Sequence, residues 1–370
     1  MKILIFNWRD IKNPKAGGSE LYFHEMAKRW IASGNKVSMI CGGWKNCKNK
    51  ENVDGVEIIR VGSPMTLYAL SPVAFFKMKE EPDIIIDVEN GIPFFTQLFV
   101  RNKKIFLHIH HVHKGVWFKQ LPLPLAIIGW FIETKIMPRV YQKVPILTIS
   151  ESSKKEIENE KLGKVIGVIN PGINFAEYKK YSKNKKPVVL FLNRIKKYKG
   201  LDVLLQAVKE IKKYKIDLEI WIAGGGDKTE VEKMKKYVLQ NDLNNVKFLG
   251  KISEEKKAEL MQKAWIFVNP SFKEGWGIVN IESNYFGTPV IGSNVSGIKD
   301  SIVDGKTGLL FEYENPHQLA EKIKEIILNK RLRKKMELNS KNWSKKFDFQ
   351  SKAKEYLGII ENYISLKKVK

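Results

Sequence analysis

The chain has 370 residues, of which 43% are hydrophobic and 28% are charged, and its formal net charge is +25. This length allows two hydrophobic cores, so we expect two domains. The longest apolar stretch, residues 121–132, is shorter than the roughly 20 residues of a membrane-spanning helix. Cys41 and Cys47 have no metal-ligand spacing and suit a reducing compartment, and nothing at the amino terminus resembles a signal peptide. We therefore expect a cytoplasmic protein.

The positive charge comes mainly from lysine: of 65 basic residues eight are arginine, which leaves 65 − 8 = 57 lysines. Nucleic-acid recognition usually uses many arginines, so we expect no nucleic-acid partner and attribute the charge to a composition bias. An anionic membrane surface, at the inner membrane face, is the second interpretation. Trp117, Phe118, Trp130 and Phe131 surround the apolar stretch 121–132 and suit such a surface. An ordinary buried helix explains the same aromatic residues and is the preferred interpretation.

Strands and helices alternate along the first half of the chain. An amphipathic helix is predicted at residues 19–32. Strands are predicted at residues 3–6, 36–40, 56–61, 84–87, 105–109, 146–149 and 165–169.

A polar, basic stretch at residues 177–186 interrupts this alternation, which then starts again. We place the domain boundary here and expect a first domain at residues 1–183 and a second at 184–349. In the second half we predict strands at residues 187–192, 218–223, 246–249, 265–269 and 287–292, and helices at 201–213, 229–239, 254–263, 277–286 and 344–363. The expected fold is α/β, with two Rossmann-like domains whose parallel sheets face a central cleft.

Two glutamates, Glu274 and Glu282, frame a glycine turn. Gly275 and Gly277 allow the backbone to approach a ligand closely, and the first amides of the helix predicted at residues 277–286 have no partners within that helix. Such a helix start attracts phosphate. A rise of about 1.5 Å per residue puts Glu282 roughly 7 Å further along, where its carboxylate can accept hydrogen bonds from a ribose.

On pattern alone, a turn residue at Glu274 and a solvated helix position at Glu282 explain this segment equally well. The flanks favour a ligand site, because a buried strand at residues 265–269 precedes the turn and the next strand follows at 287–292. Open α/β sheets bind ligands at the carboxyl ends of their strands. We therefore interpret Glu282 as a ribose contact and Glu274 as a contact to the group that the phosphates carry, a sugar.

Two further loops carry groups suited to a diphosphate. Gly17 and Gly18 precede the first predicted helix and allow backbone approach to phosphate, although Ser19 as an N-cap explains the loop without a ligand. Arg194 and Lys199 follow the first strand of the second domain, where two cations can neutralise a departing nucleoside diphosphate. A solvated cap is the alternative for Lys199.

Glycine-bearing loops follow two successive strands of the second domain. The loop at residues 224–226 lacks the spacing of a dinucleotide-binding motif. The backbone at Lys251, after the next strand, is our candidate for contact with the nucleotide base.

Four of the six histidines, His108, His110, His111 and His113, gather at one predicted strand end. Strand alternation puts His108 and His110 on one face, and imidazole is the commonest metal ligand. We expect no metal, because no nearby pair of cysteines or acidic residues completes a coordination sphere. Residues 87–91, at the end of the preceding strand, are expected to line the same cleft.

These segments together resemble the retaining glycosyltransferases of family four, which have the GT-B architecture; the strongest similarity lies between residues 191 and 310. The resemblance implies that Glu282 holds the nucleotide ribose and that Glu274 contacts donor-sugar hydroxyls. It also places His110 near the reacting sugar carbon, with His111 as a competing assignment. The predicted catalytic residues are His110, Glu274, Arg194 and Lys199, and the predicted donor-binding residues are Gly17, Gly18, Lys251, Gly275, Trp276, Gly277, Ile278 and Glu282.

The chain departs from the family pattern at Asn193, where most members have glycine before the arginine. The resemblance further implies that the C-terminal helix, at about residues 350–370, crosses back onto the first domain.

We expect a retaining glycosyltransferase that moves a hexose of mannose or glucose type from a nucleotide-diphosphate sugar to a hydroxyl acceptor in glycan or glycolipid synthesis. Neither guanine nor uracil is favoured as the base. No cofactor and no metal are expected. Two alternatives remain: a nucleotide-sugar epimerase or hydrolase of the same fold, and a basic nucleic-acid-binding protein.

Overall fold

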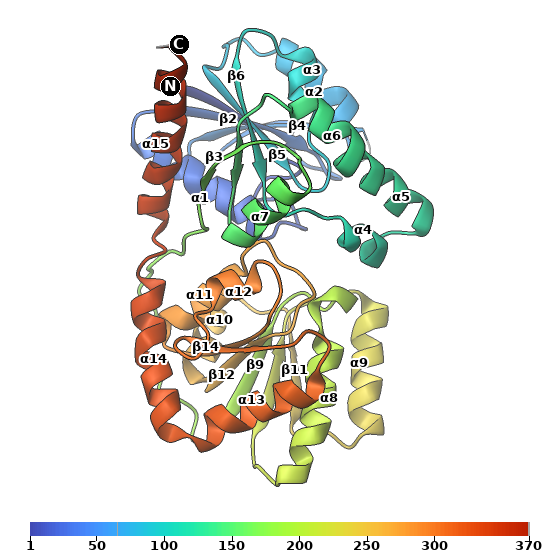
Figure 1. Ribbon diagram of the computed structural model, residues 1–370, viewed down its shortest axis with the longest axis vertical. Helices are drawn as coiled ribbons and strands as arrows, with labels where there is room; N and C mark the ends of the chain where they lie inside the picture. Colours follow the sequence, from blue (N-terminus) through green and yellow to red (C-terminus); the bar gives the residue numbers. More distant parts are fainter. Residues whose placement is uncertain (65, 369–370) are drawn as a thin grey trace. The chain divides into compact units, whose positions relative to one another are not determined.

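The computed structural model describes residues 1–64 and 66–368. The chain forms two compact units (Figure 1). Unit 1 contains Met1–Gly172 and Asp348–Lys370, and unit 2 contains Ile173–Phe347.

Unit 1 is built on an eight-stranded sheet with the order β3-β4-β2-β1-β5-β6-β7-β8. The short polar strand β3 runs antiparallel to β4 at one edge, and the other neighbouring pairs are parallel. From β1 the chain adds β2 and β4 on one side of the sheet and β5 to β8 on the other, so the strand order reverses between β1 and β5. Doubly wound sheets bind ligands at this point. The strands are β1 (Lys2–Phe6), β2 (Lys36–Gly42), β3 (Lys50–Val53), β4 (Val56–Val61), β5 (Ile84–Glu89), β6 (Lys104–Ile109), β7 (Ile146–Thr148) and β8 (Val165–Val168).

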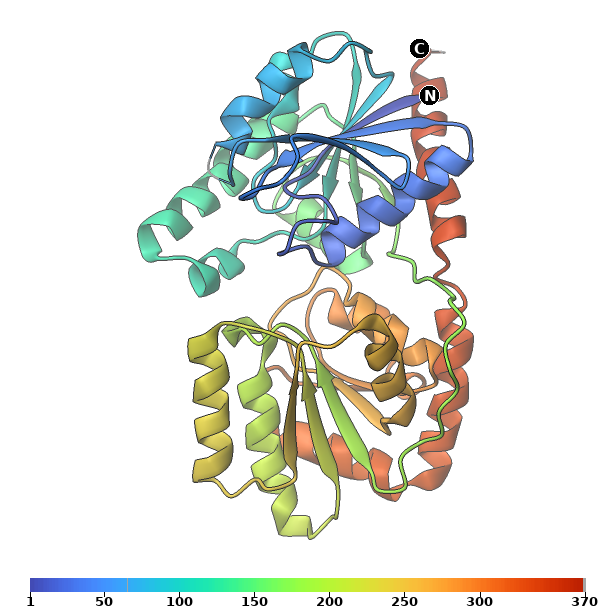
Figure 2. The same ribbon diagram turned by 180° about the vertical axis from the view of Figure 1, so that it is seen from behind.

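The helices of unit 1 cover both faces of this sheet (Figures 1 and 2). α1 and the C-terminal helix α15 lie side by side on one face. The elements are α1 (Gly18–Ala32), α2 (Leu67–Phe76), α3 (Thr96–Phe99), α4 (Gly115–Gln120), α5 (Leu123–Phe131), the π-helical turn η1 (Ile132–Ile136), α6 (Met137–Tyr141), α7 (Glu151–Asn159) and α15 (Phe349–Lys368).

Aromatic and polar contacts hold α15 in unit 1. The Tyr356 ring stacks on His108 with ring centroids 5.7 Å apart, and the indole N–H of Trp30 donates to the carbonyl of Ala353 at 3.0 Å. The C-terminal helix therefore packs on the first domain, as expected. Two residues of its expected range, Val369 and Lys370, lie outside the described part of the chain.

Unit 2 is built on a six-stranded parallel sheet with the order β11-β10-β9-β12-β13-β14. Its order reverses between β9 and β12, and buried apolar clusters cover both faces. The strands are β9 (Val188–Leu192), β10 (Glu219–Ala223), β11 (Val246–Gly250), β12 (Ile266–Asn269), β13 (Val290–Ser293) and β14 (Gly308–Phe311). The helices are η2 (Lys197–Lys199), α8 (Leu201–Ile211), η3 (Lys212–Tyr214), α9 (Lys228–Gln240), α10 (Glu254–Lys263), α11 (Ile278–Tyr285), α12 (Ile298–Ser301), α13 (Pro316–Leu328) and α14 (Lys330–Ser344).

The second unit begins at residue 173, earlier than the boundary at residue 184 that we predicted from the polar stretch. The polar linker is tied to unit 2 by its hydrogen bonds. The amide of Tyr181 donates to Gln262 at 3.0 Å, and the Lys183 ammonium donates to the carbonyl of Ala264 at 2.6 Å. Polar composition alone does not reveal such tethering.

The predicted strands and helices are confirmed within a few residues, and the two-sheet α/β fold is confirmed with them. The helix predicted at residues 344–363 is wrong at its start, because α14 ends at Ser344 and α15 begins only at Phe349. Two edge strands were not predicted: β3, whose short sequence KENV has no apolar alternation, and β14, whose sequence is the apolar GLLF. Within residues 1–64 and 66–368, no helix has the length and apolarity needed to cross a membrane.

Candidate active site

In unit 2, the loops after β9 and β12 meet at the switch point of the sheet. Gly200 has φ +71°, and a Cβ built there would lie 2.1 Å from the carbonyl oxygen of Pro270. The amide of Phe272 donates to the carbonyl of Tyr198 at 2.8 Å. This close approach requires glycine at position 200 and fixes the two loops to each other.

Lys199 and Glu274, one from each of these loops, form an ion pair. The Lys199 side chain is largely buried, and burial by itself lowers the pKa of an ammonium. The Glu274 carboxylate outweighs that effect, so the pKa of Lys199 is raised and the group stays charged. The structure thus brings two predicted residues together as a fixed cation and anion at the strand ends.

Arg194 lies on the same loop as Lys199 and is exposed. Its charge acts on Lys199, where it slightly opposes the raised pKa. The Asn193 side chain accepts a hydrogen bond from the Arg194 amide at 3.2 Å, and the Asn193 amide donates to Ala223 at 3.2 Å. Asparagine therefore stabilises the turn at the position where the family pattern has glycine.

The turn before α11 is held by a buried polar network. Gly277 is the N-cap residue with φ +79°, and a Cβ built there would lie 2.7 Å from the Asn280 side-chain nitrogen. The Asn280 amide oxygen accepts from Asn269 at 3.0 Å, and its nitrogen donates to Ser301 at 2.9 Å. Sequence reasoning missed these three polar residues, because their positions far apart in the chain give no local motif.

Gly275 and Ile278 lie on the two sides of this turn, and Ile278 is the first residue of α11. Trp276 is buried, with its ring centroid 5.3 Å from that of Phe347. The indole of Trp276 thus packs inside unit 2, and the Asn280 side chain fills the space that a side chain at position 277 would need.

Glu282 lies on α11 beyond the turn. Its Oε1 pairs with the Lys257 ammonium at 2.8 Å, and Lys257 also pairs with Glu254 at 2.6 Å. The Glu282 Oε2 is buried and has no hydrogen-bond partner among the described residues. Burial raises the pKa of Glu282 although Lys257 lowers it. A buried carboxylate oxygen without a donor is costly, and a ligand hydroxyl would relieve that cost.

Lys251 follows β11 and is exposed. The preceding residue, Gly250, accepts a hydrogen bond from the Gly224 amide at 2.7 Å, so the loops after β10 and β11 are joined. Lys251 and Arg194 thus lie at the same edge of the sheet. Lys251 follows β11 and Arg194 follows β9, two strands away.

In unit 1, His110 follows β6 and is buried, with its Nε2 2.7 Å from the Ser19 hydroxyl. Ser19 is not the N-cap that the pattern suggested. Gly17 is the N-cap of α1, and its amide donates to the Glu20 carboxylate at 2.7 Å. Ser19 is therefore free of the capping role and instead orients His110, while a Cβ built at Gly18 would meet nothing within 4 Å.

Burial lowers the pKa of His110 to about 3, with a smaller contribution from the charge of His113. Burial also holds the pKa of His108 far below its usual value. Strand alternation does put these two rings on one face, with centroids 4.8 Å apart. His111 lies outside this pair and stacks on His113 at 4.4 Å. At neutral pH His110 is therefore an uncharged imidazole.

The expectation that no acidic residues accompany the histidines is wrong. Ligand atoms of Glu89, His113 and Glu133 lie within 4.8 Å of one another, a spacing that a cation can occupy. Glu133 already accepts hydrogen bonds from the amides of His113 and Lys114 and from the indole of Trp117, at 2.5, 2.8 and 2.9 Å. These bonds assign Glu133 to holding the start of α4. No local motif points to Glu133, because it lies 20 residues after His113.

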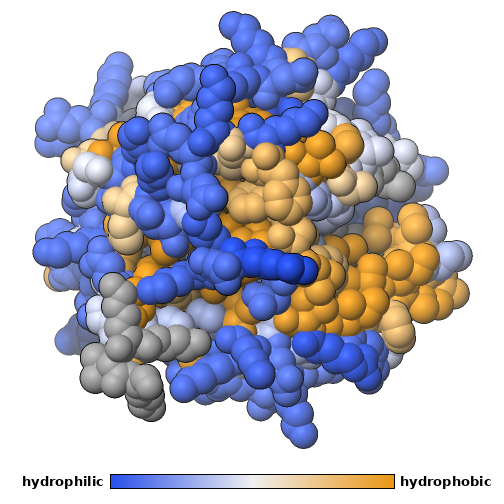
Figure 3. Space-filling view, turned by 90° about the horizontal axis from the view of Figure 1, so that it is seen from above, coloured by the Kyte–Doolittle hydropathy of each residue, from blue (hydrophilic) through white to orange (hydrophobic). Residues whose placement is uncertain are grey.

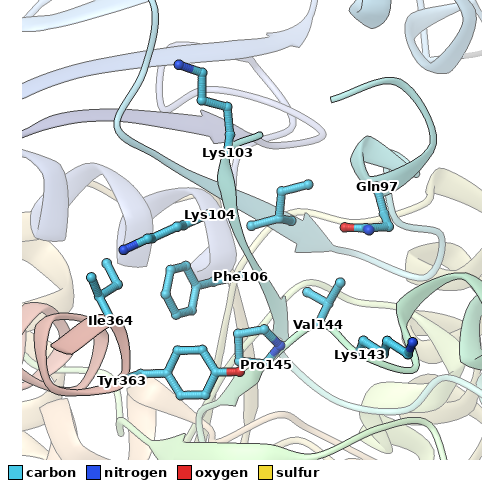
Figure 4. A pocket seen from close by; sticks show the side chains of 10 residues that line it. Gln97, Lys103, Lys104, Phe106, Lys143, Val144, Pro145, Tyr363 and Ile364 are labelled. Carbon is cyan, nitrogen blue, oxygen red and sulfur yellow. The ribbon is translucent and has the colours of Figure 1, made fainter. Parts of the chain in front are cut away.

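A cavity of about 220 Å³ lies at the opposite edge of the unit 1 sheet (Figure 4). Lys104 and Phe106 of β6 line it together with Tyr363 of α15. A rise of about 3.3 Å per residue puts Lys104 roughly 20 Å from His110 along the strand. This cavity is therefore separate from the residues predicted for catalysis.

Two family models cover most of the chain. The model "Glycosyltransferase Family 4" matches residues 16–177, and the model "Glycosyl transferases group 1" matches residues 174–343. The two matches adjoin near the junction of the two units.

Relatives in sequence include an uncharacterised glycosyltransferase of Methanocaldococcus jannaschii, 33% identical over 55% of this chain and 56% of that protein. Another is the capsular polysaccharide biosynthesis glycosyltransferase CapM of Staphylococcus aureus, 30% identical over 51% of this chain and 53% of CapM. The matched part thus spans about half the length of each of these two relatives.

Solved structures with the same fold include sucrose-phosphate synthase of Thermosynechococcus elongatus, with a TM-score of 0.83, 21% identity and full coverage of both chains. The Anabaena protein HepE in complex with UDP-glucose has a TM-score of 0.76 and 18% identity, and it covers 99% of this chain and 100% of its own. The chain therefore has the GT-B fold and belongs to the family 4, group 1 glycosyltransferases.

Proposed function

We propose that the protein is a retaining, metal-independent hexosyltransferase that takes its sugar from a nucleotide-diphosphate donor and passes it to a hydroxyl acceptor. The single observation that carries this proposal is the buried, unpartnered Oε2 of Glu282, which lies beyond a glycine turn on a helix that starts at Ile278. A ribose hydroxyl supplies the donor that this oxygen lacks, and a diphosphate suits the amides of the helix start.

The charges at the strand ends support the same assignment. Lys199 is held charged by Glu274, and Arg194 is exposed on the same loop. A leaving nucleoside diphosphate gains negative charge when its bond to the sugar breaks, so two cations at its phosphates stabilise the transition state. Glu274, the partner of Lys199, then has its second oxygen available for sugar hydroxyls. The named relative HepE was solved with UDP-glucose, which supports a nucleotide sugar as the donor.

The proposed reaction needs no covalent intermediate. The acceptor oxygen bonds to the anomeric carbon on the face from which the diphosphate leaves, and the bond from that carbon to the diphosphate oxygen breaks. The acceptor proton passes to a phosphate oxygen, which balances the charge. Neutral His110 contributes a hydrogen bond beside the reacting carbon, since its low pKa leaves it uncharged at pH 7.

Nucleotide binding tests this proposal directly. Titration calorimetry with UDP and GDP in buffer containing EDTA should give binding by the unaltered protein, since the assigned contacts involve no metal. Glu282→Gln should weaken that binding about 10- to 100-fold, the usual value of a lost charge-assisted hydrogen bond. Affinity should also fall as the pH drops through the raised pKa of Glu282, because the protonated carboxyl is a weaker acceptor.

Glu254→Gln is the matched control, because it removes the other carboxylate that pairs with Lys257 and leaves the Glu282 Oε2 unchanged. Its nucleotide affinity should stay within about twofold of the unaltered protein. Equal affinity in all three proteins would disprove the ribose assignment, and binding that requires a divalent cation would disprove metal independence.

A further inference from the structure

The hairpin of α4 and α5 in unit 1 presents apolar side chains to solvent. We name it the α4–α5 surface and define it by its exposed large apolar residues: Phe118, Leu121, Leu123, Leu125, Ile127, Ile128 and Phe131. Figure 3 shows a broad hydrophobic area at the right of the molecule, on the side where Figure 1 places α5. The preferred interpretation of this segment as an ordinary buried helix is therefore wrong.

α5 buries its small residues and exposes its large apolar ones, whereas a core helix does the opposite. Its buried positions are the small residues Ala126 and Gly129. A Cβ built at Gly129 would lie 2.9 Å from the Trp117 ring, so α5 rests on α4 through its smallest residues. The large aliphatic residues of α5 consequently point away from the hairpin. Burial of such side chains away from water is favourable, which gives the hairpin a strong tendency to bind an apolar phase.

The charge around this surface identifies that phase. Residues 114–139, which contain the hairpin and the turns that follow it, have four basic residues and a single acidic one, Glu133, which is buried. The exposed ionic side chains of this stretch are therefore all positive. The basic residues are Lys114, Lys119, Lys135 and Arg139, and Lys114 also pairs with Glu160.

We propose that the α4–α5 surface docks the protein on an anionic lipid bilayer. Apolar side chains surrounded by lysine and arginine suit the boundary between acyl chains and acidic headgroups. α5 has nine residues and rises about 14 Å, against the roughly 30 Å of a hydrocarbon core, so it lies in the interface and does not span it.

Two other occupants fit less well. A second copy of the chain would bring two positive surfaces together, which like-charge repulsion opposes. Single-stranded nucleic acid stacks its bases on aromatic rings, whereas five of the seven residues that define this surface are leucine or isoleucine.

Docking at this surface also has a path to His110. His111 stacks on His113 at 4.4 Å, and His113 lies 5.1 Å from the Trp117 ring of α4. The strand end that carries His110 is thus joined to the hairpin by three packed rings. A bilayer at the α4–α5 surface would contact the segment that continues directly from the candidate catalytic histidine.

Vesicle co-sedimentation tests the proposal. The unaltered protein should bind vesicles of 70% phosphatidylcholine and 30% phosphatidylglycerol, and binding should weaken at high salt. Triple replacement of Leu123, Ile128 and Phe131 by Gln, at positions that are 64%, 54% and 50% exposed, should weaken it at least tenfold. The matched control replaces Leu239, Leu328 and Leu338 of unit 2, which are 77%, 65% and 62% exposed, by Gln. It has the same net charge and should bind as the unaltered protein does.

Nucleotide affinity should be the same in all three proteins, because neither set of changes touches the residues of the candidate active site. Docking therefore succeeds or fails independently of the proposed transfer reaction. The proposal is overturned if the unaltered protein does not sediment with anionic vesicles, or if the two triple variants bind them equally. A dimer in light scattering that only the hairpin variant dissociates would also overturn it, in favour of a second copy.

Discussion

The two units bury ionisable groups in opposite ways. At the switch point of unit 2, the Glu274 carboxylate raises the pKa of Lys199 and keeps it charged. Burial raises the pKa of Glu282 and so disfavours its charged form. At the strand end of unit 1, His108 and His110 are kept neutral by the same burial. Desolvation disfavours charge in both units. In unit 2 the Glu274 carboxylate keeps Lys199 charged against it, whereas in unit 1 desolvation leaves His108 and His110 neutral.

This difference fits a division of chemical work. A diphosphate needs fixed charge, and unit 2 provides a cation whose own partner prevents its neutralisation. In the proposed reaction the sugar carbon becomes electron-poor, and such a carbon tolerates a neutral imidazole better than an imidazolium; unit 1 contains a neutral imidazole at His110. If the division is correct, charge removal should be most harmful in unit 2, and charge introduction should be most harmful in unit 1.

The largest effect should come from Lys199→Met. It removes the fixed cation and should lower turnover of a nucleotide sugar about 10²- to 10³-fold, the usual value of one lost transition-state contact. Lys197→Met is the matched control, because Lys197 is an exposed lysine of the same η2 turn. Steady-state kinetics should leave the control within about twofold. Equal losses in both variants would show that only the overall charge of the loop matters.

Gly277→Ala should have the next largest effect, a loss in the free energy of unfolding. The left-handed backbone costs a non-glycine residue about 1–2 kcal/mol, and the new Cβ would also press on Asn280, 2.7 Å away. Gly305→Ala is the matched control, since Gly305 has φ +71° and open space around it. Urea unfolding should give a loss of roughly 3 kcal/mol at position 277 and about 1 at 305. A loss at 277 no larger than at 305 would contradict the rigid polar turn.

Acid should destabilise unit 1 through its neutral histidines. A histidine whose pKa is lowered by folding contributes stability above its unfolded pKa of about 6.5, and that stability is lost as the pH falls towards the folded value, about 3 for His110. Each such group should cost about 1.4 kcal/mol per pH unit, or about 2 kcal/mol at pH 5. The free energy of unfolding should therefore depend less steeply on pH in His108→Gln. If His108→Gln keeps the original dependence, His108 is not buried in its neutral form.

The fold was largely predictable from sequence because buried parallel strands are short apolar runs with turn residues at their ends. The predicted strands follow that rule. The edge strand β3 has no such apolar run, and β14 follows the rule but was not predicted. The domain boundary was displaced because the linker at 173–183 is polar yet hydrogen-bonded to unit 2. Tethers of that kind join residues about 80 positions apart and leave no local pattern.

In the candidate site, residue types were predictable and their partners were not. Glu274 and Lys199 both stood out in the sequence, but only the structure pairs them across 75 residues. The alternative interpretation of Ser19 as a helix cap rested on the frequency of serine at that position, but Gly17 takes that role. The α4–α5 segment was assigned to the core because composition does not reveal which face of a short apolar helix is covered.

The smallest effect should come from Ser19→Ala. The Ser19 hydroxyl lies 2.7 Å from the His110 Nε2, and in the proposed reaction it acts only by orienting that ring. Its loss should lower kcat by about threefold to tenfold, the value of one hydrogen bond of about 1 kcal/mol, and should leave nucleotide affinity unchanged. Ser19→Thr keeps the hydroxyl and should restore most of the activity. A fall in nucleotide affinity in Ser19→Ala would instead mean that the start of α1 binds the donor itself, and the separation of charged and uncharged halves would then not hold.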